Sequence, residues 1–466
     1  MIQTLHNYFD GQFQKAPLQG RESSHQKHTL LSPADQSVTL WENQICFTHI
    51  ESILNSAQHG LEKWQKSSYS DRKLLLENYL NLIENKKREL AQTLTLENGQ
   101  PYTDNLAEIE LVLKLSPAIL KQFDEQISSK KNCISRPRGP ALFIGSFIRP
   151  VYYTHSFILA NLFSGNSVII KPSEKVALTT QKLLECLHQA NFPTGAINLI
   201  HDAKDGEITR RLLKDKRIKI VFFYGTNEVG QPLYDIASTH LERSLSFSLA
   251  RKNVCILEKG FDKNKALLDL KNSAYSFAGQ DCLKTSITFV HTSEKDAFID
   301  LFHEESKKLT INHPEQKPFM GPLINQQALD SYILHIGMAK REGLEEIMRG
   351  KHLERSQKGF YVTPSIHYCE KFIEKSHFLQ SDLLAPNLTF ISYTNLDEAI
   401  SMANSLEFPS VVSLYSTDIS TIAHCQETLE TNLILVNRPT NSAINHLNLA
   451  TQMLERCLRN VDLVKD

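Results

Sequence analysis

The sequence predicts an α/β fold of two lobes, each built around a mostly parallel, doubly wound sheet. Buried strands alternate with helices of ten or more residues between Ala141 and Gly225. The same alternation returns between Val254 and about Leu435. The chain has 466 residues, 41% of them hydrophobic, so it is long enough to bury more than one core. Ligands of such sheets bind at the carboxyl ends of the strands.

The N-terminal quarter predicts a small hairpin followed by helices. Tyr8–Phe13 reads YFDGQF, an Asp-Gly pair between aromatic residues, which is typical of a tight β-turn. Apolar residues then follow helical spacing over Ile50–Leu96 and Asn105–Glu125.

Beyond residue 140 the apolar period changes to short, continuous runs. These runs predict the strands and the crossover helix of a parallel sheet. The first lobe is predicted from strands at Ala141–Phe147, Ser167–Glu174, Ala196–Ile200 and Arg217–Gly225, with a helix at Val176–Ala190. The second lobe is predicted from strands at Ser286–His291 and Asn387–Ser392, with helices at Ala297–Leu309, Gln327–Glu342 and, at the C-terminus, Ala443–Val464.

The element order predicts a division of the chain into four parts. Residues 1–125 and 139–250 form a dinucleotide-binding lobe, and residues 251–440 form a catalytic lobe. Residues 126–138 form a bridging or oligomerisation hairpin, and residues 441–466 form a C-terminal segment that ends in a charged helix from Leu454.

Charge and cysteine content exclude several classes of protein. Lys plus Arg number 51 and Asp plus Glu 52, a net charge of −1 that gives no general attraction to nucleic acid or to an anionic membrane. No run reaches the roughly 18 apolar residues of a membrane helix, and the N-terminus does not resemble a secretory signal. Eight dispersed cysteines form no CxxC pair, and no His/Cys/Asp cluster has metal-ligand spacing. We expect a cytoplasmic protein without a metal.

Three motifs give the chain a family resemblance. They are Lys171-Pro-Ser-Glu174, the turn that starts at Tyr224-Gly-Thr, and Gly279-Gln-Asp-Cys282. In this order and spacing the chain resembles the aldehyde dehydrogenase superfamily, and most closely its succinylglutamate-semialdehyde dehydrogenase branch of arginine catabolism. The resemblance implies NAD(P)-dependent oxidation of a small aldehyde or semialdehyde, in a protein that often forms a homodimer.

Cys282 is the candidate nucleophile. An aldehyde gives up hydride readily only after a nucleophile has made it tetrahedral, and a thiolate can do this through a thiohemiacetal and then a thioester. The position of Cys282 after Gly279-Gln280 and beside polar Asp281 favours this role. The alternative is a cysteine that simply packs in a core.

The resemblance also implies residues that bind the cofactor. Lys171 and Glu174 would bind the adenosine ribose, although Lys171 could also be an ordinary surface lysine. A carboxylate at Glu174 would repel a 2′-phosphate, which favours NAD over NADP. Gly225 and Thr226 would let the backbone approach the pyrophosphate, and Asp382 would orient the nicotinamide ribose.

Two catalytic positions depart from the family pattern. Ile148 replaces the asparagine that donates to the oxyanion, and Arg149 is a neighbouring candidate for that donor. Ser248 replaces the glutamate that acts as general base, and its hydroxyl cannot take a proton from water. Family glycines are replaced as well, at Ala250, Arg251 and Ala385.

These departures leave three functions open. The first is a dehydrogenase of impaired activity. The second is an inactive homologue that keeps the fold and serves as a nucleotide-binding or scaffold protein. The third passes its acyl group to coenzyme A, a thiol that needs no general base, although Ile148 does not fit that reading.

Overall fold

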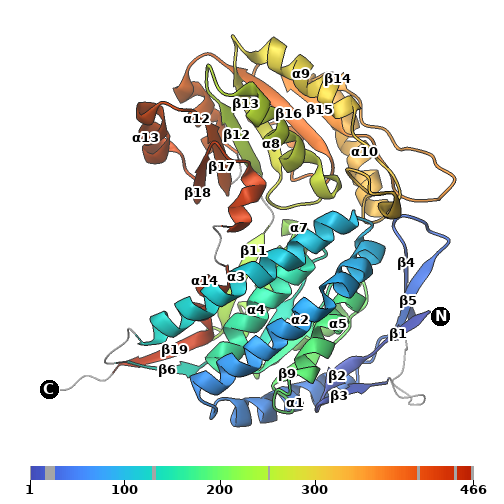
Figure 1. Ribbon diagram of the computed structural model, residues 1–466, viewed down its shortest axis with the longest axis vertical. Coiled ribbons are helices and arrows are strands. Elements are labelled where there is room, and N and C mark those ends of the chain that lie inside the picture. The colour runs from blue at the N-terminus through green and yellow to red at the C-terminus, as the bar shows by residue number, and fades with distance from the viewer. Residues whose placement is uncertain are drawn as a thin grey trace.

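A computed structural model describes residues 2–15, 27–128, 133–249, 252–406, 410–445 and 449–462. The chain folds into two α/β lobes, each containing a seven-stranded sheet. In Figure 1 the N-terminal lobe lies below and the second lobe above. Within the described residues, no helix is both long and apolar enough to cross a bilayer.

The sheet of the N-terminal lobe is parallel over its first five strands. Its order is β11 (Ser244–Leu249), β10 (Ile220–Gly225), β7 (Ala141–Ile144), β8 (Val168–Lys171), β9 (Ile197–Leu199), β2 (Asn7–Phe9) and β3 (Gln12–Gln14). β2 is antiparallel to both β9 and β3. Asp10 and Gly11 connect β2 to β3 with φ values of 51° and 76°, which confirms the predicted Asp-Gly hairpin.

Helices cover both faces of this sheet. They are α1 (His49–Trp64), α2 (Tyr69–Asn98), α3 (Tyr102–Ser128), α4 (Pro150–Ser164), α5 (Ala177–Gln189), α6 (Glu207–Lys214) and α7 (Asn227–Ala237). The helical stretch predicted from Ile50 is two helices, because Ser68 caps α2 in a capping box with Asp71. Every residue of α4 is buried, as expected of a helix surrounded by core.

The second lobe has its own sheet. Its order is β14 (Glu345–Met348), β15 (Ser365–Cys369), β16 (Asn387–Tyr393), β13 (Thr285–His291), β12 (Asn253–Leu257), β17 (Val411–Tyr415) and β18 (Leu433–Val436). The β14–β15 pair is antiparallel and the other pairs are parallel. The helices are α8 (Lys263–Tyr275), α9 (Lys295–Lys307), α10 (Gln326–Arg341), α11 (His377–Gln380), α12 (Leu396–Asn404) and α13 (Ile419–Thr428).

Two smaller sheets complete the fold. β5 (Thr39–Gln44) lies between β1 (Gln3–Leu5) and β4 (Lys27–Leu31). β6 (Cys133–Pro137), in the segment predicted as a hairpin, pairs antiparallel with β19 (Leu458–Asp462). Figure 1 shows this ribbon projecting from the N-terminal lobe.

The C-terminal segment corrects one prediction. The helix α14 (Leu449–Cys457) ends at Cys457, and the chain continues as β19, not as the charged helix expected from Leu454. The side chain of Leu454 is buried against the core of the N-terminal lobe. Pairing with a distant strand therefore outweighs the local charge pattern.

Candidate active site

Cys282 lies on a loop that a left-handed turn holds in place. Phe277, Ala278 and Gly279, in the 3-10 turn Ser276–Gly279, have φ values of 56°, 54° and 66°. A Cβ at Gly279 would lie 2.2 Å from the carbonyl oxygen of Ala385, so only glycine fits there. Residues other than glycine rarely adopt this left-handed backbone conformation, and those that do cluster at functional sites.

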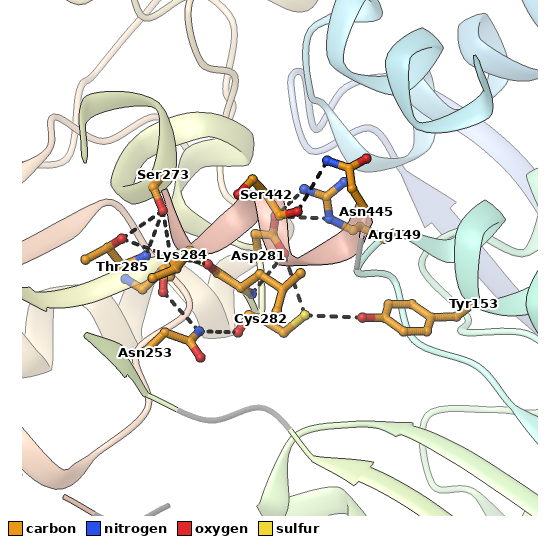
Figure 2. A network of polar contacts seen from close by, with 12 residues as sticks. Arg149, Tyr153, Asn253, Ser273, Asp281, Cys282, Lys284, Thr285, Ser442 and Asn445 are labelled. Atoms are coloured by element: carbon orange, nitrogen blue, oxygen red, sulfur yellow. Dashed lines mark hydrogen bonds and ion pairs between the residues drawn. The ribbon is translucent and has the colours of Figure 1, made fainter. Parts of the chain in front are cut away.

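The sulfur of Cys282 faces the N-terminal lobe. It lies 3.4 Å from the hydroxyl oxygen of Tyr153 on α4, as Figure 2 shows, and it also accepts a short hydrogen bond from the hydroxyl of Tyr224 at the end of β10. The two tyrosine rings stack with their centroids 3.4 Å apart. Cys282 is only 9% exposed and packs in the core of that lobe.

The environment of Cys282 stabilises the neutral thiol. Burial, and then the carboxylate of Asp281, raise the pKa of Cys282 to about 12, although the tyrosine hydroxyls and Arg149 act in the opposite direction. The thiolate is the nucleophilic form of cysteine. In this conformation the thiol is therefore protonated near neutral pH.

The guanidinium of Arg149 pairs with Asp281, the residue next to this thiol. Its Nε donates to Oδ2 of Asp281 over 3.0 Å, and its Nη2 donates to the same oxygen. Both side chains are buried, 9% and 4% exposed, and the guanidinium also lies 5.0 Å from the centroid of the Phe277 ring. Arg149, sitting before α4 with φ of 41°, is thus fixed across the lobe junction by the ion pair shown in Figure 2.

Ile148 is buried beside a small polar cavity. The cavity measures about 10 Å³ and is lined by Asn98, Gln100, Glu108, Phe147, Ile148, Arg149, Phe277, Gln280 and Asp281. This volume holds water but not an aldehyde. The side chain of Ile148 is apolar, so it supplies no hydrogen bond to an oxyanion.

Ser248 lies on the edge strand β11, where its side chain is exposed. It pairs in register with Tyr224, so both side chains lie on the same face of the sheet. That face points toward Cys282, and it carries serine where the family pattern has a carboxylate. Ala250 and Arg251, the predicted glycine replacements, lie outside the described residues.

The predicted ribose-binding residues lie close together. Lys171 ends β8 and Glu174 follows it in the next turn. Burial would raise the pKa of Glu174, but the ammonium groups of Lys171 and Lys175 outweigh it and hold that pKa below its usual value. The pair can therefore present one cation and one anion at the carboxyl end of a strand, where a ribose would bind.

Gly225 and Thr226 lie where β10 ends and α7 begins. Thr226 is the N-cap of α7 and makes no side-chain capping bond, so the first-turn amides of that helix are not capped by it. A Cβ at Gly225 would lie 2.7 Å from the Phe223 ring, and one at Gly230 would lie 2.5 Å from Leu249. A side chain at either position would clash with Phe223 or Leu249, so both glycines are needed for these residues to pack.

Asp382 is exposed and belongs to the second lobe, whereas the other cofactor candidates belong to the N-terminal lobe. It interacts electrostatically with two buried lysines that sequence reasoning missed. Lys284 donates to the carbonyl of Ala385 over 2.7 Å, and Lys252 donates to that of Phe378 over 3.1 Å. Burial lowers the pKa of Lys252 to about 7 and that of Lys284 to about 8.

A nicotinamide dinucleotide would fit only part of this site. Lys171, Glu174 and the start of α7 suit a ribose and a pyrophosphate. A hydride acceptor, however, must touch the carbon bonded to the sulfur of Cys282. The hydroxyls of Tyr153 and Tyr224 contact that sulfur from the N-terminal side, so in this conformation the protein itself covers that side of the sulfur.

Comparison with models of known protein families establishes the family of this chain. The model of the aldehyde dehydrogenase family matches residues 21–450. This chain belongs to the aldehyde dehydrogenase family. Among solved structures, this family member resembles 3,6-anhydro-L-galactose dehydrogenase in complex with NAP, with a TM-score of 0.89, 21% identity and 99% of each chain covered. It also resembles a Thermus 1-pyrroline-5-carboxylate dehydrogenase with bound NAD, with a TM-score of 0.88, 19% identity and 99% and 93% covered.

Two sequence relatives of this aldehyde dehydrogenase family member are named as a semialdehyde dehydrogenase and a pyrroline-carboxylate dehydrogenase. The malonate-semialdehyde dehydrogenase of Bacillus pumilus is 26% identical over 447 residues, which cover 94% of this chain and 90% of the relative. The 1-pyrroline-5-carboxylate dehydrogenase of Staphylococcus epidermidis is 26% identical over 374 residues, covering 77% and 71%. These relatives do not support the expected resemblance to succinylglutamate-semialdehyde dehydrogenase.

Proposed function

We propose that this protein oxidises a small aldehyde to its acid with NAD as the oxidant, through Cys282 and at a low rate. The observation that carries the proposal is the position of Cys282. Its loop comes from the second lobe and its sulfur meets the N-terminal lobe, beside the strand ends that would bind a nucleotide. Relatives named malonate-semialdehyde dehydrogenase support a small aldehyde as the substrate class.

The first chemical step needs the sulfur of Cys282 as a thiolate. The thiolate adds to the carbonyl carbon, the C=O π electrons move onto oxygen, and a thiohemiacetal oxyanion results. Three features of the site slow the reaction. The raised pKa of Cys282 keeps the thiol protonated, Ile148 gives the oxyanion no donor, and Ser248 gives water no base. A missing oxyanion donor alone costs about 10²–10³ in rate.

NAD is the proposed cofactor in preference to NADP. Glu174 is held ionised by Lys171 and Lys175, and a carboxylate beside a ribose accepts a hydrogen bond from its hydroxyl. Titrating the protein with each dinucleotide and following its intrinsic fluorescence tests this preference. Equal affinity for the two would contradict it.

A second candidate is an inactive homologue that keeps nucleotide binding. The contacts of Tyr153 and Tyr224 with the sulfur favour it, because these side chains cover the sulfur on the side of the N-terminal lobe. An assay with NAD and a panel of small aldehydes, followed by the absorbance of reduced cofactor, separates the two candidates. Turnover that is lost in Cys282→Ser supports the dehydrogenase, whereas nucleotide binding without any turnover supports the inactive homologue.

Restoring the two missing catalytic side chains tests whether their loss causes the low rate of turnover. Ile148→Asn with Ser248→Glu returns the oxyanion donor and the general base, and we expect turnover to rise by about 10² or more. Tyr224→Thr added to this pair should raise turnover further, because it frees space beside the sulfur. No gain in any variant would show that these positions do not limit the reaction.

We also propose a homodimer formed through the β6–β19 ribbon. A two-stranded ribbon is marginally stable alone, and its outer edges can pair with another strand. Sedimentation equilibrium of the full chain and of a variant ending at Cys457 tests the proposal. We expect a dimer and a monomer respectively, and a dimer in both would show that the ribbon is not the interface.

A further inference from the structure

The hydroxyl of Tyr153 is placed to receive one proton and give another beside the sulfur of Cys282. Its oxygen lies 3.4 Å from that sulfur, a contact in which either atom can be the donor and which Figure 2 shows. A phenolic hydroxyl can accept a hydrogen bond and donate one at the same time. Tyr153 is only 6% exposed, so its hydroxyl is largely shielded from bulk water.

The contacts of the sulfur direct the proton of the thiol. The hydroxyl of Tyr224 donates to the sulfur, so the thiol proton points to another atom. Among the described residues, two further acceptors lie within reach, the hydroxyl oxygen of Tyr153 at 3.4 Å and Oδ1 of Asp281 at 3.6 Å. Oδ1 of Asp281 already accepts from the backbone amide of Leu283 over 3.1 Å. Of the two, Tyr153 is the nearer acceptor.

An aldehyde that reacts with this sulfur brings its oxygen toward the same hydroxyl. The oxygen is bonded to the carbon that the sulfur attacks, and the reacting atoms approach to about 3–3.5 Å before the bond forms. A hydroxyl in contact with the sulfur can therefore reach the oxygen as well. The carboxylate of Asp281, which pairs with Arg149, has no proton to give to that oxygen.

We propose that Tyr153 relays a proton during the addition step: its hydroxyl accepts the proton of the Cys282 thiol and donates its own proton to the carbonyl oxygen of the aldehyde. The inference rests on the proposed function, because it assigns a catalytic residue to the first step of that reaction. Tyr224 is a positioning residue, since its hydrogen bond to the sulfur turns the thiol proton toward Tyr153.

The step balances without an external acid or base. A lone pair of the sulfur forms the C–S bond, and the electrons of the broken S–H bond stay on the sulfur. The thiol proton forms a new O–H bond on Tyr153, while the former Tyr153 proton bonds to the carbonyl oxygen through the C=O π pair. The product is a neutral thiohemiacetal, and Tyr153 ends the step as a hydroxyl. The thiolate that addition requires therefore exists only while the C–S bond forms.

The burial of these groups favours a neutral relay over free ions. Burial raises the pKa of the Cys282 thiol to about 12 and holds the pKa of the Tyr153 hydroxyl well above its ordinary value, so both groups keep their protons near neutral pH. The relay needs neither ion in free form. It also protonates the oxygen for which Ile148 provides no donor, whereas Ser248 still leaves the later hydrolysis without a base.

Other ionisable groups around the sulfur bear on any pH profile. They are Asp281 on the same loop, Arg149 and Tyr152 at the start of α4, Tyr224 at the end of β10, and Glu108 on α3, which interacts with Arg149 and Asp281. Burial raises the pKa of Glu108 to about 7, inside the pH range in which the relay is tested. Wild type and Tyr153→Phe are therefore compared with each other, because Glu108 is present in both.

Acylation of the full protein by p-nitrophenyl acetate tests the relay without any cofactor. The ester carbonyl also becomes tetrahedral at Cys282, and the first-turnover release of p-nitrophenolate gives the rate, after subtraction of the rate for Cys282→Ala. A reaction through the free thiolate accelerates about tenfold per pH unit below the pKa of the thiol. With the relay, we expect the wild-type rate to change less than about threefold between about pH 6 and pH 8.

Removing the Tyr153 hydroxyl should restore the dependence on pH. In Tyr153→Phe we expect the acylation rate at about pH 7 to fall by about 10² and to rise about tenfold per pH unit, because only the free thiolate then reacts. Tyr79→Phe is the matched control. Tyr79 is buried and stacks on His155 of α4, and its hydroxyl has no hydrogen-bond partner among the described residues. The pH profile of Tyr79→Phe should match that of wild type.

Alkylation by iodoacetamide separates the relay from a change in the thiol itself. This substitution uses the thiolate and forms no oxyanion, so Tyr153 has no proton to deliver in it. We expect Tyr153→Phe to change the alkylation rate by less than about tenfold, which is the effect of one lost hydrogen bond to the sulfur. The acylation rate should fall by clearly more.

Four results would overturn the inference. They are no acylation above that of Cys282→Ala, a wild-type rate that rises about tenfold per pH unit, a flat profile that survives in Tyr153→Phe and so assigns the proton to Asp281, and equal losses of acylation and alkylation in Tyr153→Phe. The wild-type profile decides even if Tyr153→Phe does not fold. Turnover with NAD is assayed separately, so a protein that shows the relay but oxidises no aldehyde contradicts the proposed function alone.

Discussion

At the scale of single residues, Cys282 and Glu108 are both shifted toward their neutral forms. Burial raises the pKa of the thiol to about 12 and that of the carboxyl to about 7. Arg149 opposes both shifts, but its charge is shared with Asp281. The protonation state of the site therefore follows from how deeply these groups are packed.

The reaction of Cys282 with iodoacetamide should be slow and should rise steadily with pH. With a pKa of about 12, its thiolate fraction near neutral pH is about 10³ below that of an unperturbed cysteine. Mass spectrometry of the Cys282 peptide, with glutathione as the reference thiol, measures the rate. A plateau between about pH 7 and pH 9 would show a stabilised thiolate, contrary to this expectation.

The stability of the protein should fall between about pH 5 and pH 8, partly because of Glu108. Its pKa is about 7 when folded and near 4.5 when unfolded, so the folded state binds more protons and loses stability as the pH rises through this window. We expect wild type to lose about 2–3 kcal/mol more than Glu108→Gln over this range. Urea unfolding at both pH values measures the difference, with Glu110→Gln as the control. Parallel pH profiles for wild type and Glu108→Gln would contradict the assignment.

Some residues of the candidate site could be predicted from the sequence and others could not. The replacements at Ile148 and Ser248 are visible because each stands at a fixed distance from a recognisable motif. The stacking of Tyr153 on Tyr224 and the contact of both with Cys282 join positions 129 and 58 residues away from the cysteine. No local pattern encodes such contacts, so they emerge only from the packed fold.

At the scale of elements, a buried carboxylate joins three pieces of the N-terminal lobe. Glu97 on α2 accepts from the indole of Trp41 on β5 over 2.7 Å and from the backbone amides of Leu178 and Thr179 over 2.8 Å each. The N-cap of α5 is Val176, which has no capping side chain. Glu97 therefore caps α5 from another helix.

Replacing Glu97 should destabilise the protein far more than replacing its exposed neighbour Glu89. Glu97→Ala leaves two buried amides and an indole without acceptors, and we expect a loss of about 2–4 kcal/mol. Glu89→Ala removes a surface ion pair between the same two helices, with Lys182, and should cost under about 1 kcal/mol. Urea unfolding compares the two variants, and equal losses would refute the capping role.

The elements themselves were largely predictable. Asp10-Gly11 and the apolar runs of β7, β8 and β10 have local signatures that the structure confirms. The strand β19 was wrongly expected to be helical, because its charged sequence lacks the alternation of a half-buried strand. Its conformation comes from pairing with β6, more than three hundred residues earlier in the chain.

At the scale of the whole molecule, a charged contact and an apolar one are among those that join the two lobes. The ion pair of Arg149 with Asp281 connects the start of α4 to the cysteine loop. Cys282 and Leu283 pack into the core of the N-terminal lobe although their loop belongs to the second. These contacts hold the loop against the first lobe.

Breaking the ion pair on one side should therefore loosen the junction. Asp281→Asn leaves the buried Arg149 without its counter-ion, at a cost of about 3–5 kcal/mol. Adding Arg149→Met removes the unpaired charge, and part of the stability should return. Urea unfolding of both single variants and the double variant measures the coupling between them. Additive losses would show that the two charges act independently.

Cys282 is buried in the core of the lobe to which its loop does not belong. Its chemical modification therefore reports separation of the two lobes. A reagent reaches that sulfur freely only when the loop of Cys282 separates from the N-terminal lobe, so each modified molecule reports one opening event. Any ligand or mutation that stabilises the contact between the lobes would lower the rate at which Cys282 is modified.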